Sequence, residues 1–366
     1  MKYYVIAGEA SGDLHGSNLL KQLSRLDPQA QFRCWGGDMM NAQGAELVKH
    51  YRELAFMGFA EVLMNLRTIL RNIDFCREDI RRWKPDAVIL IDYPGFNLRI
   101  AGFAKSLGIK VFYYISPQVW AWKESRVQKI KQVVDHLFVI LPFEKPFYDK
   151  HQYHVDFVGH PLLDAIGEFD AETGLSRDER KIIALLPGSR RQEIGTMLPI
   201  MLDAAEKFPG YRFVIAGAPS VPASYYQSVT GDRPVEIIAG KTYALLRNAY
   251  AALVTSGTAT LETALFGVPE VVCYKGGAIS YQIAKRLVKV KYISLVNLVM
   301  DKEVVKELIQ YELTTENLAN ELRKITEDEN YRNQLLSDYD VLKQKLGGSG
   351  ASEKTAGLIL QYLGKK

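Results

Sequence analysis

Short apolar runs alternate with helical patterns along almost the whole chain. Strands buried on both faces read as continuous apolar runs, and their alternation with helices indicates parallel sheets with helical crossovers. The predicted strands are Lys2–Ala7, Gln31–Trp35, Ala87–Ile91, Lys110–Ile115, Leu137–Ile140, Lys181–Leu186, Tyr211–Ala216, Val235–Ile238, Ala251–Thr255 and Glu270–Tyr274. The predicted helices are Gly12–Leu26, Arg67–Trp83, Asn97–Leu107, Arg126–Val134, Gln192–Phe208, Tyr243–Asn248, Ala259–Phe266 and Ile279–Val288.

The alternation restarts after a polar stretch without strand pattern, Glu168–Arg180. We therefore predict the α/β class, with two Rossmann-like, doubly wound domains at 1–167 and 168–346 and a C-terminal helix at 347–366. The pattern leaves open whether that helix packs back on the first domain. Ligands of doubly wound sheets bind outside the carboxyl ends of the strands, so we expect the site in the loops that follow strands, in a cleft between the domains.

Composition narrows the class of protein without indicating a reaction. The 366 residues are 48% hydrophobic and 24% charged, which is typical of globular proteins. A net charge of +4 is too small to indicate a dedicated nucleic-acid-binding protein. The three cysteines, Cys34, Cys76 and Cys273, form no CxxC pair, which favours a reducing compartment over a disulfide framework or zinc cluster. No secretory signal is predicted, and no apolar run reaches the about 18 residues of a membrane-spanning helix.

The loop after the first strand, Gly8–Gly16, combines three glycines with polar side chains. Free amides at a helix start suit a phosphate or a polar sugar, and Ser11, Gly12 and Asp13 are the candidate binding residues. His15 close to the carboxylate of Glu9 could accept a proton near neutral pH. The alternative is an ordinary capping loop with Ser11 or Asp13 as the cap.

Two further loops of the first domain carry candidate residues. Asp92 follows a strand and precedes a stiff Pro turn, which suits a general base, whereas Asn97 fits a helix cap as well as a binding residue. Gln118 lies beside two tryptophans, Trp120 and Trp122, whose indoles stack on sugar faces in some sites and fill cores in others.

The second domain offers two loops suited to a nucleotide. Gly188, Ser189 and Arg190 follow a strand at a Pro-Gly turn, and arginine at a positive helix N-terminus favours a bound anion such as a diphosphate. A solvated first turn is the alternative. Ser256, Gly257 and Thr258 open another helix, and Glu262, one turn later, could accept hydrogen bonds from ribose hydroxyls.

An apolar stretch flanked by cations is typical of a protein that rests on an anionic membrane surface. Its candidate acyl or membrane contacts are Phe56, Met57, Phe59, Val62, Leu63, Met64 and Leu66, and several arginines follow from Arg67 onward. A similar pairing occurs at Lys285–Leu295. The alternative is a core helix with a solvated face.

Together these motifs resemble one known family. The segments are GEASGDLHG (8–16), IDYPGFN (91–97), SPQVWAWK (116–123), LPFEKPFY (141–148), GHPLLD (159–164), LPGSRRQEI (186–194), SGTATLE (256–262) and AKRLVKVKYISLVNL (284–298). Their combination, in order and at natural spacing, resembles the lipid-A-disaccharide synthases over most of residues 3–310.

The resemblance implies an inverting glycosyltransferase of the GT-B type, with two Rossmann-like domains facing across a cleft. Its substrates would be UDP-2,3-diacylglucosamine and lipid X (2,3-diacylglucosamine 1-phosphate), and its products β(1→6)-linked lipid A disaccharide phosphate and UDP. It implies a cytoplasmic protein peripherally associated with the inner membrane of Gram-negative bacteria, acting in lipid A and lipopolysaccharide biosynthesis. No cofactor and no essential metal are expected, because GT-B enzymes generally use protein cations and helix ends on the diphosphate.

Residue roles follow from the matched motifs. Asp92 would be the base that deprotonates the acceptor hydroxyl, with Glu9 and His15 as the other candidates, and Arg190 would stabilise the leaving diphosphate. Ser256, Gly257, Thr258 and Glu262 would bind the nucleotide, whereas Glu9, Ser11, Asp13 and Asn297 would face the sugars. The chain departs from the family pattern at Gly95, where a second Asp is frequent, and at Met300-Asp301, where small residues are expected.

Other functions share parts of this pattern. A UDP-GlcNAc 2-epimerase or the transferase that forms lipid II has the same architecture, but the epimerase needs no apolar, basic surface and the lipid II enzyme carries different glycine-rich loops. A non-catalytic nucleotide-sugar-binding protein would not need carboxylates at strand ends such as Glu9 and Asp92.

Overall fold

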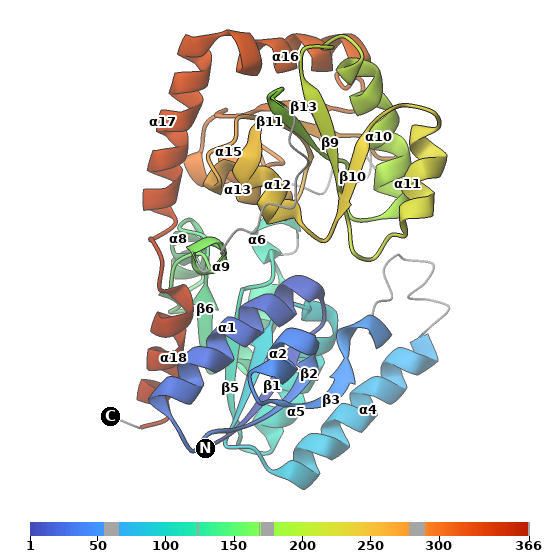
Figure 1. Ribbon diagram of the computed structural model, residues 1–366. Helices are drawn as coiled ribbons and strands as arrows, with labels where there is room; N and C mark the ends of the chain where they lie inside the picture. Colours follow the sequence, from blue (N-terminus) through green and yellow to red (C-terminus); the bar gives the residue numbers. More distant parts are fainter. Residues whose placement is uncertain (55–65, 123, 168, 170–178, 278–289, 365–366) are drawn as a thin grey trace. The chain divides into compact units, whose positions relative to one another are not determined.

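A computed structural model describes residues 1–54, 66–122, 124–167, 169, 179–277 and 290–364. The chain divides into two compact units. Unit 1 consists of Met1–Gly167 together with Leu346–Lys366, and unit 2 of Glu168–Lys345. Each unit is built on one parallel sheet covered by helices (Figure 1).

Among the described residues of unit 1, seven strands form a single parallel sheet in the order β3-β2-β1-β4-β5-β6-β7. These strands are β1 (Lys2–Ala7), β2 (Gln31–Gly36), β3 (Glu46–His50), β4 (Ala87–Ile91), β5 (Lys110–Tyr114), β6 (His136–Val139) and β7 (Asp156–Phe157). The helices are α1 (Ala10–Leu26), α2 (Asp38–Ala42), α4 (Leu66–Trp83), α5 (Pro94–Ser106), α6 (Val119–Trp122), α7 (Arg126–Val133), α8 (Glu144–Lys150), α9 (Leu162–Gly167) and α18 (Ala351–Tyr362). All residues of β4 are buried, which explains its uninterrupted apolar sequence.

The described part of unit 2 contains six strands in one parallel sheet of order β10-β9-β8-β11-β12-β13. These strands are β8 (Ile182–Leu186), β9 (Arg212–Gly217), β10 (Glu236–Ala239), β11 (Ala249–Thr255), β12 (Glu270–Tyr274) and β13 (Lys306–Ile309). The helices are α10 (Arg191–Ala205), α11 (Ala223–Thr230), α12 (Thr242–Asn248), α13 (Thr258–Leu265), α15 (Leu295–Met300), α16 (Thr315–Glu327) and α17 (Glu329–Lys345). The helix predicted at Ile279–Val288 lies outside the described residues.

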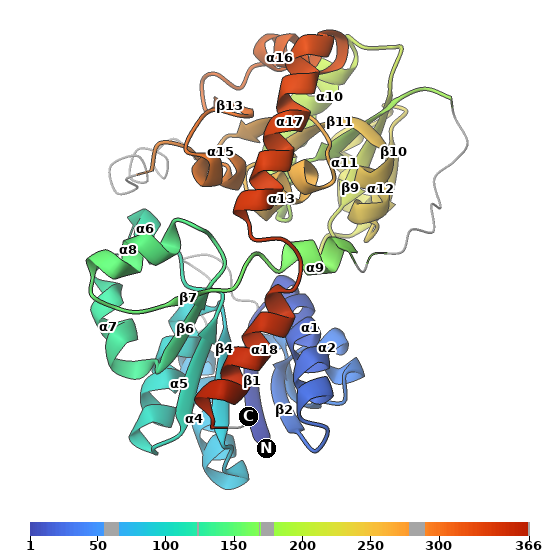
Figure 2. The same cartoon turned by 90° about the vertical axis from the view of Figure 1, so that its left-hand side faces the viewer.

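The C-terminal helix α18 belongs to unit 1, where it packs against α1 and α9 (Figure 2). Its N-terminus is capped by Asp164, whose carboxylate accepts hydrogen bonds from the amides of Gly350 (2.6 Å) and Ser352 (2.9 Å). Near its other end, Tyr362 stacks on His136 with ring centroids 3.6 Å apart and donates a hydrogen bond to Asp156. The last helix is therefore anchored at both ends to the first unit.

In each sheet the strand order reverses at one place, between β1 and β4 in unit 1 and between β8 and β11 in unit 2. Loops on either side of such a switch point diverge to opposite faces of the sheet and leave room for a ligand at the carboxyl ends of the strands. The register aligns Ala7 with Ile91 in unit 1 and Leu186 with Val254 in unit 2. The loops after these four strands therefore begin beside each other, in pairs.

Candidate active site

The switch point of unit 1 brings Glu9 and Asp92 together. Glu9 precedes α1 directly after β1, and Asp92 follows β4. The Glu9 side chain is exposed, whereas Asp92 is half-buried. The negative charge of Glu9 acts on both Asp92 and Tyr93, which places the two carboxyl groups in one electrostatic environment.

The backbone at Asp92 is held in an unusual conformation. Asp92 and Tyr93 both have positive φ, 44° and 48°, in the left-handed region that costs energy for residues other than glycine. Asn97 Nδ2 (2.7 Å) and the Tyr113 hydroxyl both donate hydrogen bonds to the Asp92 carbonyl oxygen. These fully buried donors stabilise the turn, so the Asn97 Nδ2 positions the Asp92 backbone.

Gly8 allows this turn to pack closely. A Cβ atom at position 8 would lie 2.3 Å from the ring of Tyr93, which is far inside any van der Waals contact. The ring therefore covers Gly8, and any larger residue there would push away the segment that carries Asp92.

The surroundings of Asp92 make its carboxylate a better base than an exposed one. Burial raises its pKa to about 6, and the charge of Glu9 contributes in the same direction. Such a carboxyl group is mostly ionised at neutral pH, yet it holds a proton more tightly than an ordinary aspartate. Both properties suit a general base that works near pH 7.

The structure assigns Asp13 and His15 structural roles. Asp13 is 3% exposed and accepts hydrogen bonds from the backbone amides of Gly37, Met39 and Met40, so it caps α2 instead of facing a sugar. His15 is buried, and burial lowers its pKa to about 4. A pKa this low makes the imidazole a weak base near neutral pH, which does not favour the proton-accepting role. The titratable groups that act on it are Asp164 and His160.

The remaining candidates of unit 1 differ in accessibility. Ser11 and Gln118 are exposed, whereas Gly12 is buried close to Ala7. Trp120 packs edge-to-face on Phe143 at 4.8 Å, a contact that fits its core interpretation.

No role was predicted for Glu144, the buried first residue of α8, which follows β6. Its carboxylate accepts hydrogen bonds from the amides of Ile140 and Leu141, and burial raises its pKa to about 7. The motif in which Glu144 lies was visible in the sequence, but its inward direction was not.

In unit 2 the loop after β8 presents a set of hydrogen-bond donors suited to an anion. Gly188 has φ of 115°, which only glycine adopts readily, and the turn directs the amides of Ser189 and Arg190 to one point. The carboxylate of Glu193 lies at that point. It accepts hydrogen bonds from both amides (3.0 and 3.3 Å) and from Arg190 Nη1 (3.2 Å).

Glu193 was not among the predicted site residues, yet it occupies the donors of this loop. Two amides and a guanidinium are donors that a phosphate would use, and an acidic side chain of the protein occupies them. The signal was present in the sequence as an acidic residue three positions after the helix cap, which is the spacing of a capping box.

The second loop of unit 2 follows β11, the neighbour of β8. Ser256 Oγ donates a hydrogen bond to the carbonyl of Ile293, whereas Thr258 at the start of α13 is exposed. Glu262 accepts a hydrogen bond from the Tyr243 hydroxyl at 3.3 Å, and burial raises its pKa. Gly257 connects these residues, so the four nucleotide candidates share one loop and the first turns of α13.

Asn297 is buried, and its side chain is engaged within the protein. Its Nδ2 donates to the Val305 carbonyl and to Glu307, and its Oδ1 accepts from the amides of Val304 and Val305. Its hydrogen-bonding groups therefore already have partners, which does not favour the predicted place facing the sugars; that role stays a prediction. The Asn297 side chain supports the segment after α15.

The candidate acyl contacts Phe56, Met57, Phe59, Val62, Leu63 and Met64 lie outside the described residues, and Leu66 begins α4. In the other basic stretch, Lys285, Arg286 and Lys289 are also outside them, and Lys291 forms an ion pair with Asp301 at 3.3 Å. Within the described chain no helix is both long and apolar enough to cross a membrane. The same residues contain no group of three or more His, Cys, Asp or Glu arranged to hold a metal ion.

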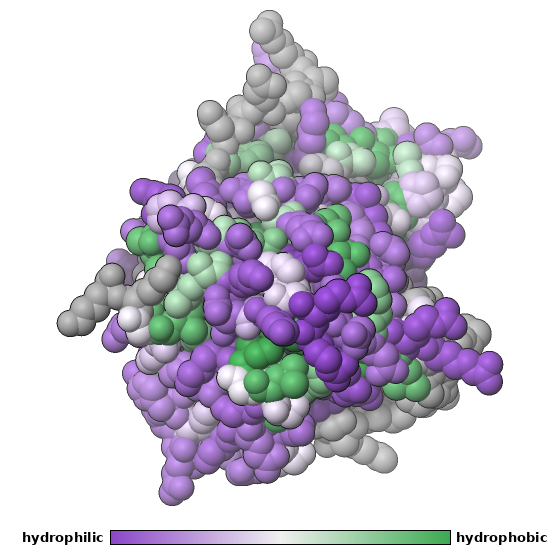
Figure 3. Space-filling model, turned by 90° about the horizontal axis from the view of Figure 1, so that it is seen from below, coloured by the Kyte–Doolittle hydropathy of each residue, from purple (hydrophilic) through white to green (hydrophobic). Residues whose placement is uncertain are grey.

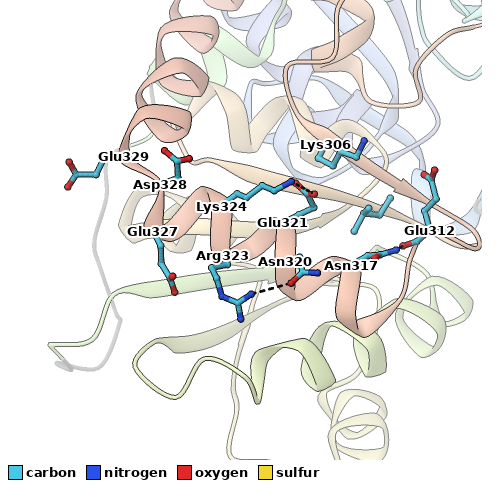
Figure 4. Close-up of a pocket in the computed structure, with 11 residues that line it drawn as sticks. Lys306, Glu312, Asn317, Asn320, Glu321, Arg323, Lys324, Glu327, Asp328 and Glu329 are labelled. Carbon is cyan, nitrogen blue, oxygen red and sulfur yellow. Dashed lines mark hydrogen bonds and ion pairs between the residues drawn. The ribbon is translucent and has the colours of Figure 1, made fainter.

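A pocket of about 1050 Å³ lies elsewhere in unit 2, between β13 and α16 (Figure 4). Its lysines are neutralised by neighbouring carboxylates, Lys306 by Glu303 and Lys324 by Glu321. Acidic side chains such as Glu312 and Glu327 also line it, and no residue of the two switch-point loops does. We therefore assign the candidate site to the switch points and not to this pocket.

The chain has two parallel-sheet α/β units, each with one switch point. This architecture is the GT-B fold. A UDP-bound structure of MnaA from S. aureus matches with a TM-score of 0.73 at 15% identity, covering 99% of this chain and 97% of that one. The UDP-GlcNAc 2-epimerase from Neisseria meningitidis, bound to UDP-GlcNAc, matches at 0.69 and 14%, with 99% and 100% covered. The glycotransferase of kitacinnamycin matches at 0.69 and 16%, with 99% of both chains covered. At such low identity these likenesses establish the fold alone.

Sequence comparison is more specific. The family model described as lipid-A-disaccharide synthetase matches residues 3–358. The lipid-A-disaccharide synthase of Geobacter metallireducens is 41% identical over 99% of this chain and 97% of that protein, and the one of Syntrophus aciditrophicus is 42% identical over the same shares. The chain belongs to the lipid-A-disaccharide synthetase family.

Proposed function

We propose that this protein transfers the sugar of UDP-2,3-diacylglucosamine to the 6-hydroxyl of lipid X, giving β(1→6) lipid A disaccharide phosphate and UDP. Membership of the family makes the chain a glycosyltransferase of lipid A biosynthesis. The single observation that carries the mechanism is the carboxylate of Asp92 at a switch point, with a pKa raised to about 6.

On the acceptor side, Asp92 takes the proton of the 6-hydroxyl while the oxygen attacks the anomeric carbon of the donor. The bond from that carbon to the diphosphate breaks on the opposite face, so the configuration inverts. Glu9 raises the basicity of Asp92 through its charge. The strained turn held by Asn97 and Tyr113 supports this role, because it fixes the Asp92 backbone before the substrate arrives.

On the donor side, the diphosphate takes the place of the Glu193 carboxylate at the amides of Ser189 and Arg190. The Arg190 guanidinium then stabilises the negative charge that develops on UDP as it leaves. The loop at Ser256–Thr258 binds the nucleotide from the neighbouring strand end, and Glu262 accepts hydrogen bonds from ribose hydroxyls. Support comes from the donor set around Glu193, which already holds an anionic group.

A peripheral position on an anionic membrane surface fits two acylated substrates. The basic helix α4 supports it: Arg67 and Arg71 are exposed near its start, beside Leu70, whose side chain is 49% exposed. On the face drawn in Figure 3 the coloured apolar residues gather in small patches between hydrophilic ones. We therefore propose a surface contact near the start of α4.

The test is a product assay with the purified chain. UDP-2,3-diacylglucosamine and lipid X are incubated with it in detergent, and mass spectrometry follows the disaccharide phosphate and UDP. We expect both products, also in excess EDTA, and a loss of turnover of at least about 100-fold in Asp92→Asn. Binding of UDP to that variant should be unchanged, because Asp92 is assigned to the acceptor.

Two controls separate this function from its rivals. With UDP-GlcNAc alone, a 2-epimerase would form the epimeric UDP-sugar, and we expect none. Absence of the disaccharide from a folded chain that binds UDP would refute the proposed reaction, and a loss of activity in EDTA that Mg²⁺ restores would refute the metal-free mechanism.

A further inference from the structure

The carboxyl group of Glu262 meets a tyrosine hydroxyl at the carboxyl edge of the sheet in unit 2. Tyr243 lies at the start of α12, which follows β10, and Glu262 lies in α13, which follows β11. The Tyr243 hydroxyl donates a hydrogen bond to Glu262 Oε1 at 3.3 Å. Two helices that follow different strands are thus joined beside the Ser256–Thr258 loop.

Aromatic contacts restrict the ring that carries this hydroxyl. Tyr243 packs edge-to-face on Phe169, with centroids 5.5 Å apart at 87°, and is tilted against Phe266 at 5.2 Å. Arg247, one turn further along α12, is directed at the Phe169 ring and not at Glu262. Because the ring is held on two sides, its hydroxyl has a defined position.

Among the described residues, Tyr243 is the one side chain that donates a hydrogen bond to Glu262, and no charged group there shifts the pKa of this carboxyl. Burial raises that pKa, and the hydrogen bond from Tyr243 opposes the rise. An ionised carboxylate has about four acceptor positions, of which the tyrosine uses one. The rest of Oε1 and all of Oε2 therefore stay available to a ligand.

We propose that Tyr243 is a positioning residue that holds the Glu262 carboxylate toward the ribose hydroxyls of the UDP-sugar, and that the pair sets the preference for a ribonucleotide donor over a deoxyribonucleotide. This inference rests on the proposed function, which assigns Glu262 to ribose. Tyr243 is thereby added to the residues that form the nucleotide site. The ribose diol should be recognised by the Glu262 carboxylate, whose orientation depends on Tyr243 in the neighbouring helix α12.

The test compares two ligands in Tyr243→Phe, a change that removes the hydroxyl and keeps the ring. The affinities of UDP and 2′,3′-dideoxy-UDP are measured by calorimetry, and their ratio is the readout. We expect UDP to bind Tyr243→Phe about 3- to 10-fold more weakly than wild type, with the affinity of dideoxy-UDP unchanged, because one hydrogen bond to a charged group is lost.

The pH dependence of the same ratio distinguishes positioning from a purely structural effect. Without the tyrosine the pKa of Glu262 rises further, so the preference for UDP should disappear at a higher pH in Tyr243→Phe than in wild type. Ionisation of the phosphate is common to both ligands and cancels in the ratio. Tyr250→Phe is the matched control. Tyr250 is another hydrogen-bonded tyrosine of unit 2, but its hydroxyl donates to the backbone carbonyl of Thr326 and the residue lies near the start of β11.

Glu262→Gln separates failure of this inference from failure of the proposed function. If that variant keeps the full preference for UDP, the ribose assignment itself is wrong. If it loses the preference while Tyr243→Phe keeps both the ratio and its pH dependence, Tyr243 has no positioning role and the inference is overturned.

Discussion

The carboxyl group of Asp92 should control the acid side of the activity profile. Its pKa of about 6 results first from burial and second from the charge of Glu9. A base must be ionised to accept a proton, so kcat/KM should rise as pH increases through about 6 and level off above about 7. Steady-state rates measured across this range check the position of the rise.

Glu9→Gln tests how much the charge of Glu9 contributes to the raised pKa of Asp92. Removing the negative charge makes ionisation of Asp92 easier, so its pKa falls and the rise in kcat/KM moves to lower pH. Ser11→Ala, an exposed neighbour in the same loop without charge, is the control and should leave the midpoint in place. A midpoint that stays near 6 in Glu9→Gln would show that burial alone sets the pKa.

Glu193 offers a test of the diphosphate assignment. Arg190 is 61% exposed and Glu193 31%, so their ion pair is solvated and worth at most about 1 kcal/mol. Glu193→Gln removes a charge that competes with the diphosphate for these donors, so UDP should bind about 2- to 5-fold more tightly. Calorimetry with UDP measures this, and uridine, which lacks the diphosphate, should bind equally well to both forms.

The matched control for this prediction is Glu206→Gln. Glu206 follows α10 at its other end and also pairs with an arginine, Arg233, so the change removes one charge of the same kind. It should not alter UDP affinity. Weaker UDP binding in Glu193→Gln would mean that the carboxylate is needed where it lies and that the diphosphate binds elsewhere.

At the residue scale the sequence located the candidate loops, but it did not show which of their polar side chains are already engaged within the protein. Asp13, Asp92 and Asn297 are all polar residues near strand ends. Their surroundings in the structure differ. Asp13 and Asn297 are hydrogen-bonded to backbone groups of neighbouring segments, whereas the Asp92 carboxyl is half-buried beside Glu9. The partners of Asp13 lie 24 to 27 residues away and those of Asn297 lie 7 to 10 residues away, beyond the next helix end, so the pattern around each residue does not reveal them.

At the scale of elements, all the strands in the middle of each sheet were predicted, whereas three of the four edge strands were missed and only the edge strand β10 was predicted. The sequence shows no apolar run at β3, β7 or β13, and all three lie at an edge in their sheet. β3 is at most half-buried, β7 has two residues, and β13 includes Lys306 and Glu307. An edge strand has one neighbour and more solvent, so its residues need not be apolar and its hydrophobic pattern is weak.

The packing of α18 on unit 1 creates a buried cluster with its own pH response. His15 and His160 are both buried, and burial lowers their pKa values to about 4 and about 3. In the unfolded chain these imidazoles titrate near their usual value of about 6.5, so the unfolded state binds more protons below that pH. Stability contributed by their neutral forms is therefore present above about pH 6.5 and is lost as pH falls toward 4.

His160→Asn should flatten this decline. Asparagine keeps an acceptor for the Leu162 amide, which bonds to Nδ1 of His160 at 3.3 Å, but does not titrate. We expect the free energy of unfolding to fall about 2 kcal/mol less between pH 7 and pH 5 than in wild type. All four tryptophans, Trp35, Trp83, Trp120 and Trp122, are in unit 1, so their fluorescence in urea follows this unit. Parallel pH curves for the two proteins would contradict the assignment.

At the scale of the whole molecule, the two units share one arrangement of sheet and candidate loops. A parallel sheet reverses its strand order once, and the residues assigned to chemistry follow the two strands on either side of the reversal. The fold class was predictable because buried parallel strands give continuous apolar runs, and the structural neighbours confirm it. The candidate loops could be located for the same reason, since strand ends can be recognised in a sequence, and their role as the site stays a prediction.

The small net charge of +4 does not show that exposed positive charge gathers at the start of α4, where we expect it to promote membrane binding. Along α4, Arg77 and Arg81 pair with Asp74 and Glu78, so they contribute little net charge. Arg67 and Arg71 are exposed and form no ion pair within the described residues. Because each basic residue near an anionic surface contributes about 1 kcal/mol, Arg67→Ser with Arg71→Ser should weaken binding to phosphatidylglycerol-containing vesicles by at least about tenfold.

Lys343→Ser with Lys345→Ser is the matched control, because it removes the same charge from the last turn of α17 in unit 2. Sedimentation with vesicles should show that this variant binds like wild type, that all three proteins bind weakly to phosphatidylcholine alone, and that added salt reduces the difference. Equal losses in the two double variants would mean that only total charge matters. In that case the start of α4 would not be the contact surface, and the acylated substrates would have to reach the site without it.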